Sequence, residues 1–133
     1  MMKLTADVKE AMSKNRIFAL ATASKSGVPN VVPVGMLVVK DDENIWVVDN
    51  YMDKTLANVK ENPQVSFYVW VPEHPNSYQV KCDVVVEDSG KDYEEAVKYA
   101  HSIKEIYPAK TLLKLKVREI YYVSPGPNAG KKV

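Results

Sequence analysis

The chain has 133 residues, of which 46% are hydrophobic and 26% charged, and its 18 Lys and Arg residues nearly balance 17 Asp and Glu residues. This composition is ordinary for one globular domain, and a chain of this size can bury a core without disulfides. A net charge of +1 excludes the strong basic field of a nucleic-acid-binding or membrane-surface protein. The single cysteine, Cys82, excludes an intrachain disulfide and a cysteine-built metal site.

The longest apolar run, residues 31–39, is too short to cross a bilayer, and the first residues lack the apolar stretch of a signal peptide. We therefore expect a cytoplasmic protein with neither a membrane nor a nucleic acid as partner. No repeat or shift in composition divides the chain. Residues 1–133 are predicted to form one domain, with 124–133 as a turn-rich C-terminal tail.

The first elements of the chain are a helix and a pair of strands. Thr5 is a good N-cap, and Val8, Ala11 and Met12 follow it at helical spacing. A β-rich segment, residues 16–23, ends at the hairpin turn 24–27. The almost continuous apolar run 31–39 then predicts a strand buried on both faces.

The remaining elements continue this mainly β pattern. Strands are predicted at residues 45–49, 64–71, 78–87 and 111–123, and helices at 54–62 and 92–107. Short turns join most successive strands, which favours an antiparallel sheet closed into a barrel over a doubly wound sheet. The expected fold is a six-stranded antiparallel β-barrel with about three short peripheral helices.

Most familiar catalytic and metal-binding patterns are missing from the sequence. Neither a Gly-rich dinucleotide fingerprint nor a phosphate loop is present. His74 and His101 lie 27 residues apart, and because histidines are mostly exposed we expect each to be an ordinary loop or helix-surface residue and no metal site. Cys82 lies among apolar neighbours in a predicted strand, which favours a packed and inert thiol.

One segment, residues 47–58, does carry a chemical signal. A strand ends, a polar loop follows, and a helix begins at Lys54 and Thr55. Free N–H groups at a helix start favour anions, and a Lys and a hydroxyl there would add a charge and a donor. The alternative is that Asp53 simply caps this helix. Lys54 is then unfavourable in the first turn, unless a bound phosphate offsets its charge.

The chain resembles the pyridoxamine-phosphate-oxidase-like family of flavin-binding split barrels. The matching pieces follow one another from residue 17 to the tail: the strand 17–22, the G-x-P-x-x-x-P-V pattern of residues 27–34, the helix start at Lys54 and Thr55 with Asn58 and Asn62-Pro63, and the strands around residues 78–86. The fold implied by the resemblance is a split β-barrel.

The resemblance also implies a cofactor and its site. The cofactor would be flavin mononucleotide (FMN), with a deazaflavin less expected, bound where two subunits of a homodimer meet. Lys54 and Thr55 would hold the phosphate, with Asn58 in support, while Pro33, Val34 and Gly35 would lie by the ring. Asp49, Asn50 and Tyr51 would form the loop beside the ribityl chain.

The implied activity is that of a flavin-dependent oxidoreductase, whose small-molecule or protein redox partner the residues do not specify. A flavin carrier, a sensor and a cofactor-free interaction module remain as alternatives. With only Arg16 and Arg118 to clamp a second phosphate, the chain is not expected to be a true pyridoxamine phosphate oxidase.

Three other features allow two interpretations each. The tail could cover a partner subunit's flavin or be a loose terminus. Trp46, Tyr68 and Trp70 could stack on a flavin or lie in a core or dimer interface. The alternating cations of the last strand, Lys114, Lys116 and Arg118, indicate a solvated face or a groove for an acidic partner.

Overall fold

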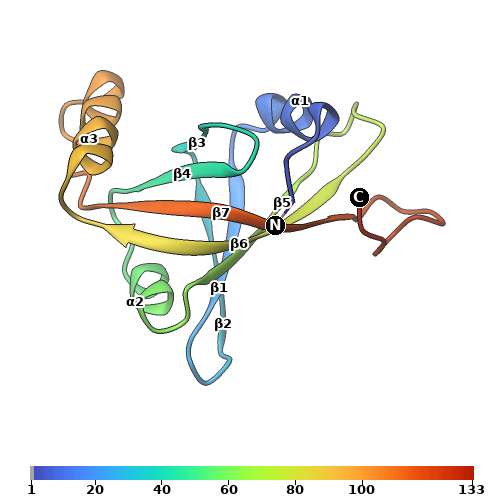
Figure 1. Cartoon of the computed structure of the whole chain (residues 1–133), viewed down its shortest axis with the longest axis horizontal. Helices are drawn as coiled ribbons and strands as arrows, with labels where there is room; N and C mark the ends of the chain where they lie inside the picture. Colours follow the sequence, from blue (N-terminus) through green and yellow to red (C-terminus); the bar gives the residue numbers. More distant parts are fainter. Residues whose placement is uncertain (1) are drawn as a thin grey trace.

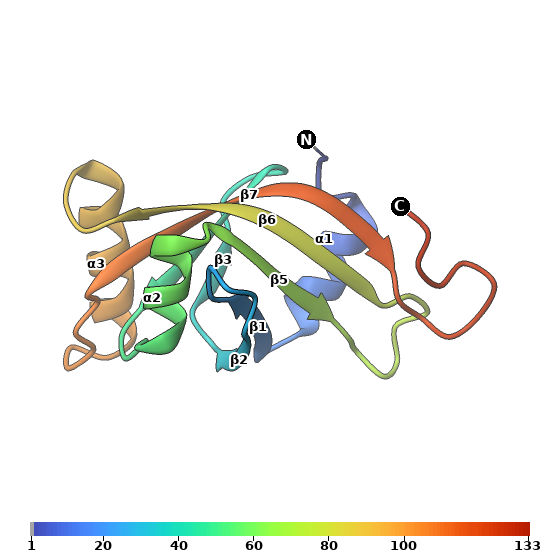
Figure 2. The ribbon, with the colours of Figure 1, turned by 90° about the horizontal axis from the view of Figure 1, so that it is seen from below.

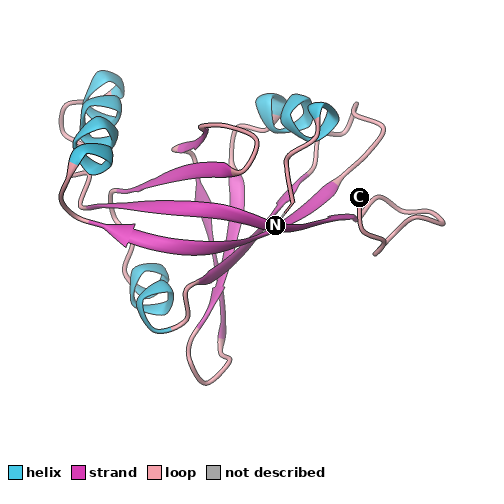
Figure 3. Cartoon of the chain, in the orientation of Figure 1, coloured by secondary structure: helices cyan, strands magenta, loops and turns pink. Residues whose placement is uncertain are grey.

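The computed structural model describes residues 2–133, which form a strongly curled sheet with helices at its periphery (Figure 3). Its elements, in chain order, are α1 (Ala6–Lys14), β1 (Phe18–Ala23), β2 (Pro29–Val34), β3 (Leu37–Val39), β4 (Asn44–Asp49), α2 (Lys54–Glu61), β5 (Gln64–Val69), β6 (Tyr78–Glu87), α3 (Lys91–Ile103) and β7 (Thr111–Tyr122). The predicted mainly β fold with an antiparallel sheet and three short helices is confirmed.

The sheet is a barrel with one open seam. Its strand order is β2-β1-β5-β6-β7-β4-β3, and each neighbouring pair is antiparallel. The two edge strands, β2 and β3, are consecutive in the chain and are separated only by Gly35 and Met36. So short a connection spans at most about 11 Å. The sheet must therefore curl until its edges nearly meet, which produces the rolled shape in Figure 1.

The seam corrects one prediction, because the apolar run 31–39 is two strands and not one. β2 ends at Val34 and β3 begins at Leu37, so the sheet has seven strands and not six. Nor is the run buried on both faces: Val31 is 64% exposed, and all of β3 is only half-buried. Apolar side chains favour apolar neighbours over water. Within this chain, Val31 and the residues of β3 lack enough such neighbours to be fully buried.

The main core fills the inside of the barrel, and α1 covers part of it. Alternate residues of β6 point inward, as predicted: Tyr78, Val80, Cys82 and Val84 are all buried. On α1, the Thr5 hydroxyl accepts the Val8 amide hydrogen at 3.2 Å, which confirms the predicted N-cap. The predicted stripe of Val8, Ala11 and Met12 joins the same core.

A second, smaller core lies between α3 and the outer face of the sheet. Ala96 and Ala100 of α3 pack there with Trp46 and Val48 of β4. Trp46 is 9% exposed, and the Lys40 ammonium lies 4.2 Å from the centre of its ring. This burial confirms the interpretation of Trp46 as a core residue.

The C-terminal tail folds back on β7. Lys132 pairs with Tyr121, and the Val133 amide donates to the Ile120 carbonyl at 3.0 Å. Figures 1 and 2 agree that this tail lies at the end of the barrel opposite α2 and α3. Within residues 2–133, no helix has the length and apolar character needed to span a membrane.

Candidate functional site

A pocket of about 430 Å³ opens at the barrel seam, between β2, the end of β4 and the start of α2. Small-molecule sites commonly have volumes of about 300–1,000 Å³. Asn30, Val32 and Val34 of β2 line it along one side, and the connection Gly35–Met36 closes one end. The pocket therefore lies where the sheet edges fail to pair.

Seven of the nine residues predicted for the cofactor site line this pocket. They are Pro33, Val34 and Gly35 at the seam, Asn50 and Tyr51 in the loop after β4, and Lys54 and Thr55 at the start of α2. The structure thus brings together two segments that are separated by some fifteen residues of sequence. Tyr51 is 70% exposed and stands at the rim. The other two predicted residues, Asp49 and Asn58, lie behind the pocket wall.

Asp49 is fully buried and holds the loop that carries the pocket residues. Its Oδ1 accepts the Met52 amide hydrogen at 2.8 Å, and its Oδ2 accepts the Thr111 hydroxyl hydrogen at 2.8 Å. The Lys110 ammonium lies 3.8 Å from Oδ1 and donates to the Met52 carbonyl at 2.7 Å. These bonds tie the turn 49–52 to the start of β7, so Asp49 is a positioning residue.

The N-terminus of α2 faces the pocket without a side-chain cap. Asp53 has φ −124° and ψ −81°, and its carboxylate accepts no capping hydrogen bond, so the simple capping interpretation is wrong. The ion pairs of residues 2–133 engage other lysines, namely Lys9, Lys14, Lys40, Lys110, Lys114 and Lys132. The first turn of α2 therefore presents amide hydrogens and the Lys54 ammonium together, an arrangement suited to an anion.

A network of polar side chains fixes the Thr55 hydroxyl behind this first turn. The Asn30 amide donates to the hydroxyls of Thr55 at 3.0 Å and Thr22 at 3.2 Å, and the Asn58 amide donates to Thr22 at 3.0 Å. Because its oxygen accepts from Asn30, the Thr55 hydroxyl keeps its own hydrogen for another acceptor.

Sequence reasoning missed Asn30 in this network and Met36 and Met52 in the pocket wall. A signal for Asn30 was available, since it is the polar member of the inward-facing series with Val32 and Val34 in β2.

Cys82, His74 and His101 do not line the seam pocket. Cys82 is 1% exposed, and burial raises the pKa of its thiol to about 12, as expected for an inert packed cysteine. His101 lies on the surface of α3, as predicted. His74 lies in a loop, as predicted, but it is not exposed as expected: its side chain is only 4% exposed and lies 3.1 Å from an Asp7 oxygen.

Two of the three cations of β7, Lys114 and Arg118, are paired with acidic neighbours on the outer face. Lys114 donates to Asp92 at 2.7 Å and to Glu87 at 3.2 Å, and these hydrogen bonds, the one to Asp92 foremost, raise the pKa of Lys114. Arg118 contacts Asp83 at 3.1 Å. This pattern supports a solvated face over a groove for an acidic partner.

A curved antiparallel barrel whose edges meet at a pocket-bearing seam is the architecture of a split barrel. The family model described as pyridoxamine 5'-phosphate oxidase matches residues 4–124. The chain therefore belongs to the pyridoxamine 5'-phosphate oxidase family.

Individual relatives extend this result over nearly the whole chain. An uncharacterized protein of Methanocaldococcus jannaschii, MJ0282, is 34% identical over 134 residues, covering 98% of this chain and 88% of its own. The structure of HupZ from Group A Streptococcus has a TM-score of 0.81 and 24% identity, covering 96% of this chain and 99% of that one. An FMN-binding protein from Syntrophomonas wolfei has a TM-score of 0.73 and 22% identity, covering 86% and 81%.

Proposed function

We propose that the protein binds FMN in the seam pocket and acts as a flavin-dependent oxidoreductase. The observation that carries the proposal is the start of α2, where an uncapped helix N-terminus, the Lys54 ammonium and the Thr55 hydroxyl share one pocket. A phosphate monoester suits this set, because charge-assisted hydrogen bonds from amides and an ammonium favour an anion. The name of the Syntrophomonas relative supports the same cofactor.

The rest of the pocket fits the other parts of the cofactor. Pro33, Val34 and Gly35 offer a largely apolar wall for a flat ring, and Gly35 has no side chain to keep the ring from the backbone. The bound flavin would supply hydride or electron transfer, while the protein binds and orients it. Because the flavin would supply the reactive group, the pocket needs no nucleophilic side chain.

The same pocket is less suited to pyridoxamine phosphate oxidation. A second phosphate calls for a further cationic clamp, and Arg suits that task best. Arg118 is paired with Asp83 on the outer face of the sheet, and Arg16 does not line the seam pocket. We therefore propose a different substrate for the flavin. A carrier without turnover is the second candidate, and a deazaflavin the second cofactor.

We further propose that the protein is a homodimer whose subunits meet beside the pocket. Val31 of β2, Tyr68 of β5 and Trp70 just after β5 are 64%, 51% and 59% exposed on the outer side of the sheet. Between them lie small side chains of β1, such as Ala21, opposite Val31. An exposed apolar face of this kind is typical of an interface. It adjoins Pro33, so a second subunit there would lie close to the flavin ring.

The first experiment is a spectrum of the purified protein before and after addition of FMN and desalting. One retained flavin per chain supports the proposal, and a protein that retains none contradicts it. Lys54→Ala then tests the site, and Lys60→Ala, at the other end of α2, is the matched control. Loss of one charge-assisted contact costs about 1.5–3 kcal/mol, so Lys54→Ala should weaken binding roughly 10- to 150-fold. Equal FMN affinity in both variants would exclude Lys54 from the site.

Turnover distinguishes the enzyme from the carrier. Steady-state assays of the FMN-loaded protein with reduced nicotinamide and an electron acceptor test for catalysis. Activity that falls together with FMN binding in Lys54→Ala supports the oxidoreductase, whereas tight FMN binding without turnover favours the carrier.

A further inference from the structure

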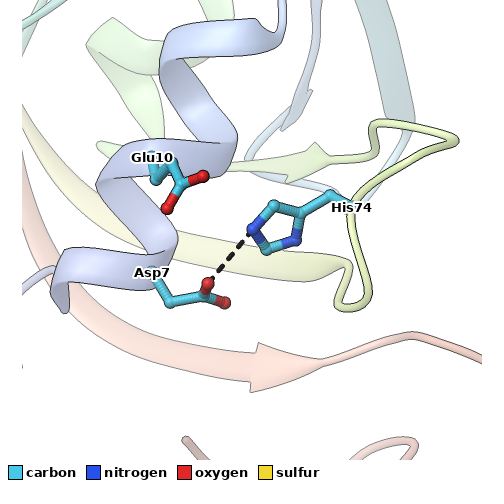
Figure 4. A group of neighbouring side chains, drawn as sticks. All are labelled: Asp7, Glu10 and His74. Atoms are coloured by element: carbon cyan, nitrogen blue, oxygen red, sulfur yellow. Dashed lines mark ion pairs between the residues drawn. The ribbon is translucent and has the colours of Figure 1, made fainter.

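A cluster of one histidine and two carboxylates joins α1 to the loop between β5 and β6, away from the seam pocket (Figure 4). Asp7 and Glu10 lie three residues apart in α1 and so share one face of the helix. His74 comes from the loop, and its ring points between the two carboxylates (Figure 4). The spacing of more than sixty residues hides this group from any search of the sequence for motifs.

The geometry of the cluster approaches that of a metal coordination shell. Its three candidate ligand atoms all lie within 4.8 Å of one another, and His74 Nε2 is 3.1 Å from Asp7 Oδ1. Around a tetrahedral Zn²⁺ with bonds of about 2.0–2.2 Å, ligand atoms lie about 3.3–3.6 Å apart. The distance between His74 Nε2 and Asp7 Oδ1 is thus only slightly shorter than the distance between two ligand atoms of such an ion. Glu10 is exposed, with only a surface contact to Lys14 at 3.3 Å, and can turn inward.

The groups around the cluster hold His74 in a suitable orientation. Its Nδ1 lies 2.9 Å from the Asn76 carbonyl oxygen, which can only accept a hydrogen. A proton on Nδ1 leaves the Nε2 lone pair facing Asp7, and either a metal ion or a second proton on Nε2 is then needed between the two. Histidine ligands commonly have this backbone hydrogen bond on their second nitrogen. The imidazole ring is almost fully buried, whereas histidines are on average only partly buried.

Asp7 is also prepared for a cation. The Tyr78 hydroxyl donates to its Oδ2, which leaves Oδ1 directed at His74. This hydrogen bond is the main reason that the pKa of Asp7 lies below its ordinary value, with smaller contributions from Asn76 and His74. The hydrogen bond from Tyr78 therefore orients the Asp7 carboxylate, as second groups usually orient ligating carboxylates.

We propose that Asp7, Glu10 and His74 form a binding site for one divalent transition-metal ion of the Zn²⁺ type. A single imidazole with two carboxylates suits such an ion, and three protein ligands leave one position for water. The ion clasps α1, which contributes Val8 and Met12 to the main core, to the β5–β6 loop. This inference does not depend on flavin binding.

The competing arrangement is a hydrogen bond without a metal. The Asn76 amide nitrogen also lies 3.2 Å from Nδ1, and if it donates there, the proton sits on Nε2 and bonds Asp7 directly. Metal binding distinguishes the two arrangements, because only the first leaves Nε2 available to an ion.

The test is calorimetric titration of ZnCl₂ into the full chain after treatment with EDTA. We expect one Zn²⁺ per chain, a higher melting temperature with Zn²⁺, and at least about 100-fold weaker binding in His74→Ala, since even supporting residues contribute 10- to 100-fold. His101→Ala is the matched control, because it removes the chain's other histidine. Buried Cys82 does not compete for the ion.

Glu10→Gln keeps the test decisive if His74→Ala fails to fold, because Glu10 is exposed. This variant should fold normally and bind Zn²⁺ more weakly than the wild type. Failure of the wild type to bind one Zn²⁺ would overturn the proposal in favour of the hydrogen-bonded pair. Unchanged binding in both His74→Ala and Glu10→Gln would overturn it as well.

Discussion

Replacement of Asp49 by Ala is expected to destabilise the protein strongly. The carboxylate is fully buried and accepts hydrogens from the Met52 amide and the Thr111 hydroxyl, each at 2.8 Å. A hydrogen bond to a charged group contributes about 1.5–3 kcal/mol, so the two together contribute about 3–6 kcal/mol. Removal of a buried charge also removes its desolvation cost, which brings the expected loss to about 3 kcal/mol.

Urea unfolding followed by circular dichroism measures this loss. With a denaturant slope near 2 kcal/mol/M, a loss of about 3 kcal/mol lowers the midpoint by roughly 1.5 M. Asp49→Asn keeps the shape and one acceptor oxygen, and should lose about half as much. Asp53→Ala is the control from the same loop, because Asp53 is exposed and makes no capping hydrogen bond. Its stability should stay within about 0.5 kcal/mol of the wild type. If Asp49→Ala and Asp53→Ala unfold at the same urea concentration, Asp49 does not hold the loop.

Three further predictions concern other parts of the molecule. Cys82 should react with a thiol reagent at neutral pH only as fast as the chain unfolds, since its thiol is buried with a raised pKa; rapid labelling of the native protein would contradict this. Val31→Asp should shift the protein from dimer to monomer in light scattering, whereas Val85→Asp, on an outer face that is similarly exposed, should not; equal behaviour would argue against the proposed interface. Because folding lowers the pKa of Asp7 from 3.8, its contribution is complete above that value and is lost as the pH falls through the folded pKa. As the pH falls below 3.8, Asp7→Asn should therefore lose less stability than the wild type, measured in EDTA. Parallel curves of stability against pH for the two proteins would exclude this contribution.

Local patterns in the sequence predicted local structure well. Thr5 caps α1, and the turn after β1 closes with the Ser24 amide donating to the Val28 carbonyl at 3.0 Å. Gly27 has φ +89°, a conformation that favours glycine. In each case the contacts that determine the structure join residues close together in the chain, so the local sequence is enough to predict it.

Two failures have one physical cause, which is contact between distant segments. The run 31–39 was predicted as one strand because apolarity alone does not reveal that the chain crosses the seam at Gly35. His74 was predicted to be exposed, yet α1 lies over it and supplies Asp7 from 67 residues away. The candidate cofactor residues were found by family resemblance, and the helix start at Lys54 was the part that physical reasoning also singled out.

The place of β7 in the sheet has a consequence for how the chain acquires its structure during synthesis. β7 pairs with both β6 and β4, although it is the last strand in sequence. Until residues 111–122 leave the ribosome, the β3–β4 hairpin has no partner that joins it to the rest of the sheet. Barrel closure must therefore wait for nearly the whole chain, and the edges of β4 and β6 stay open to wrong partners until then.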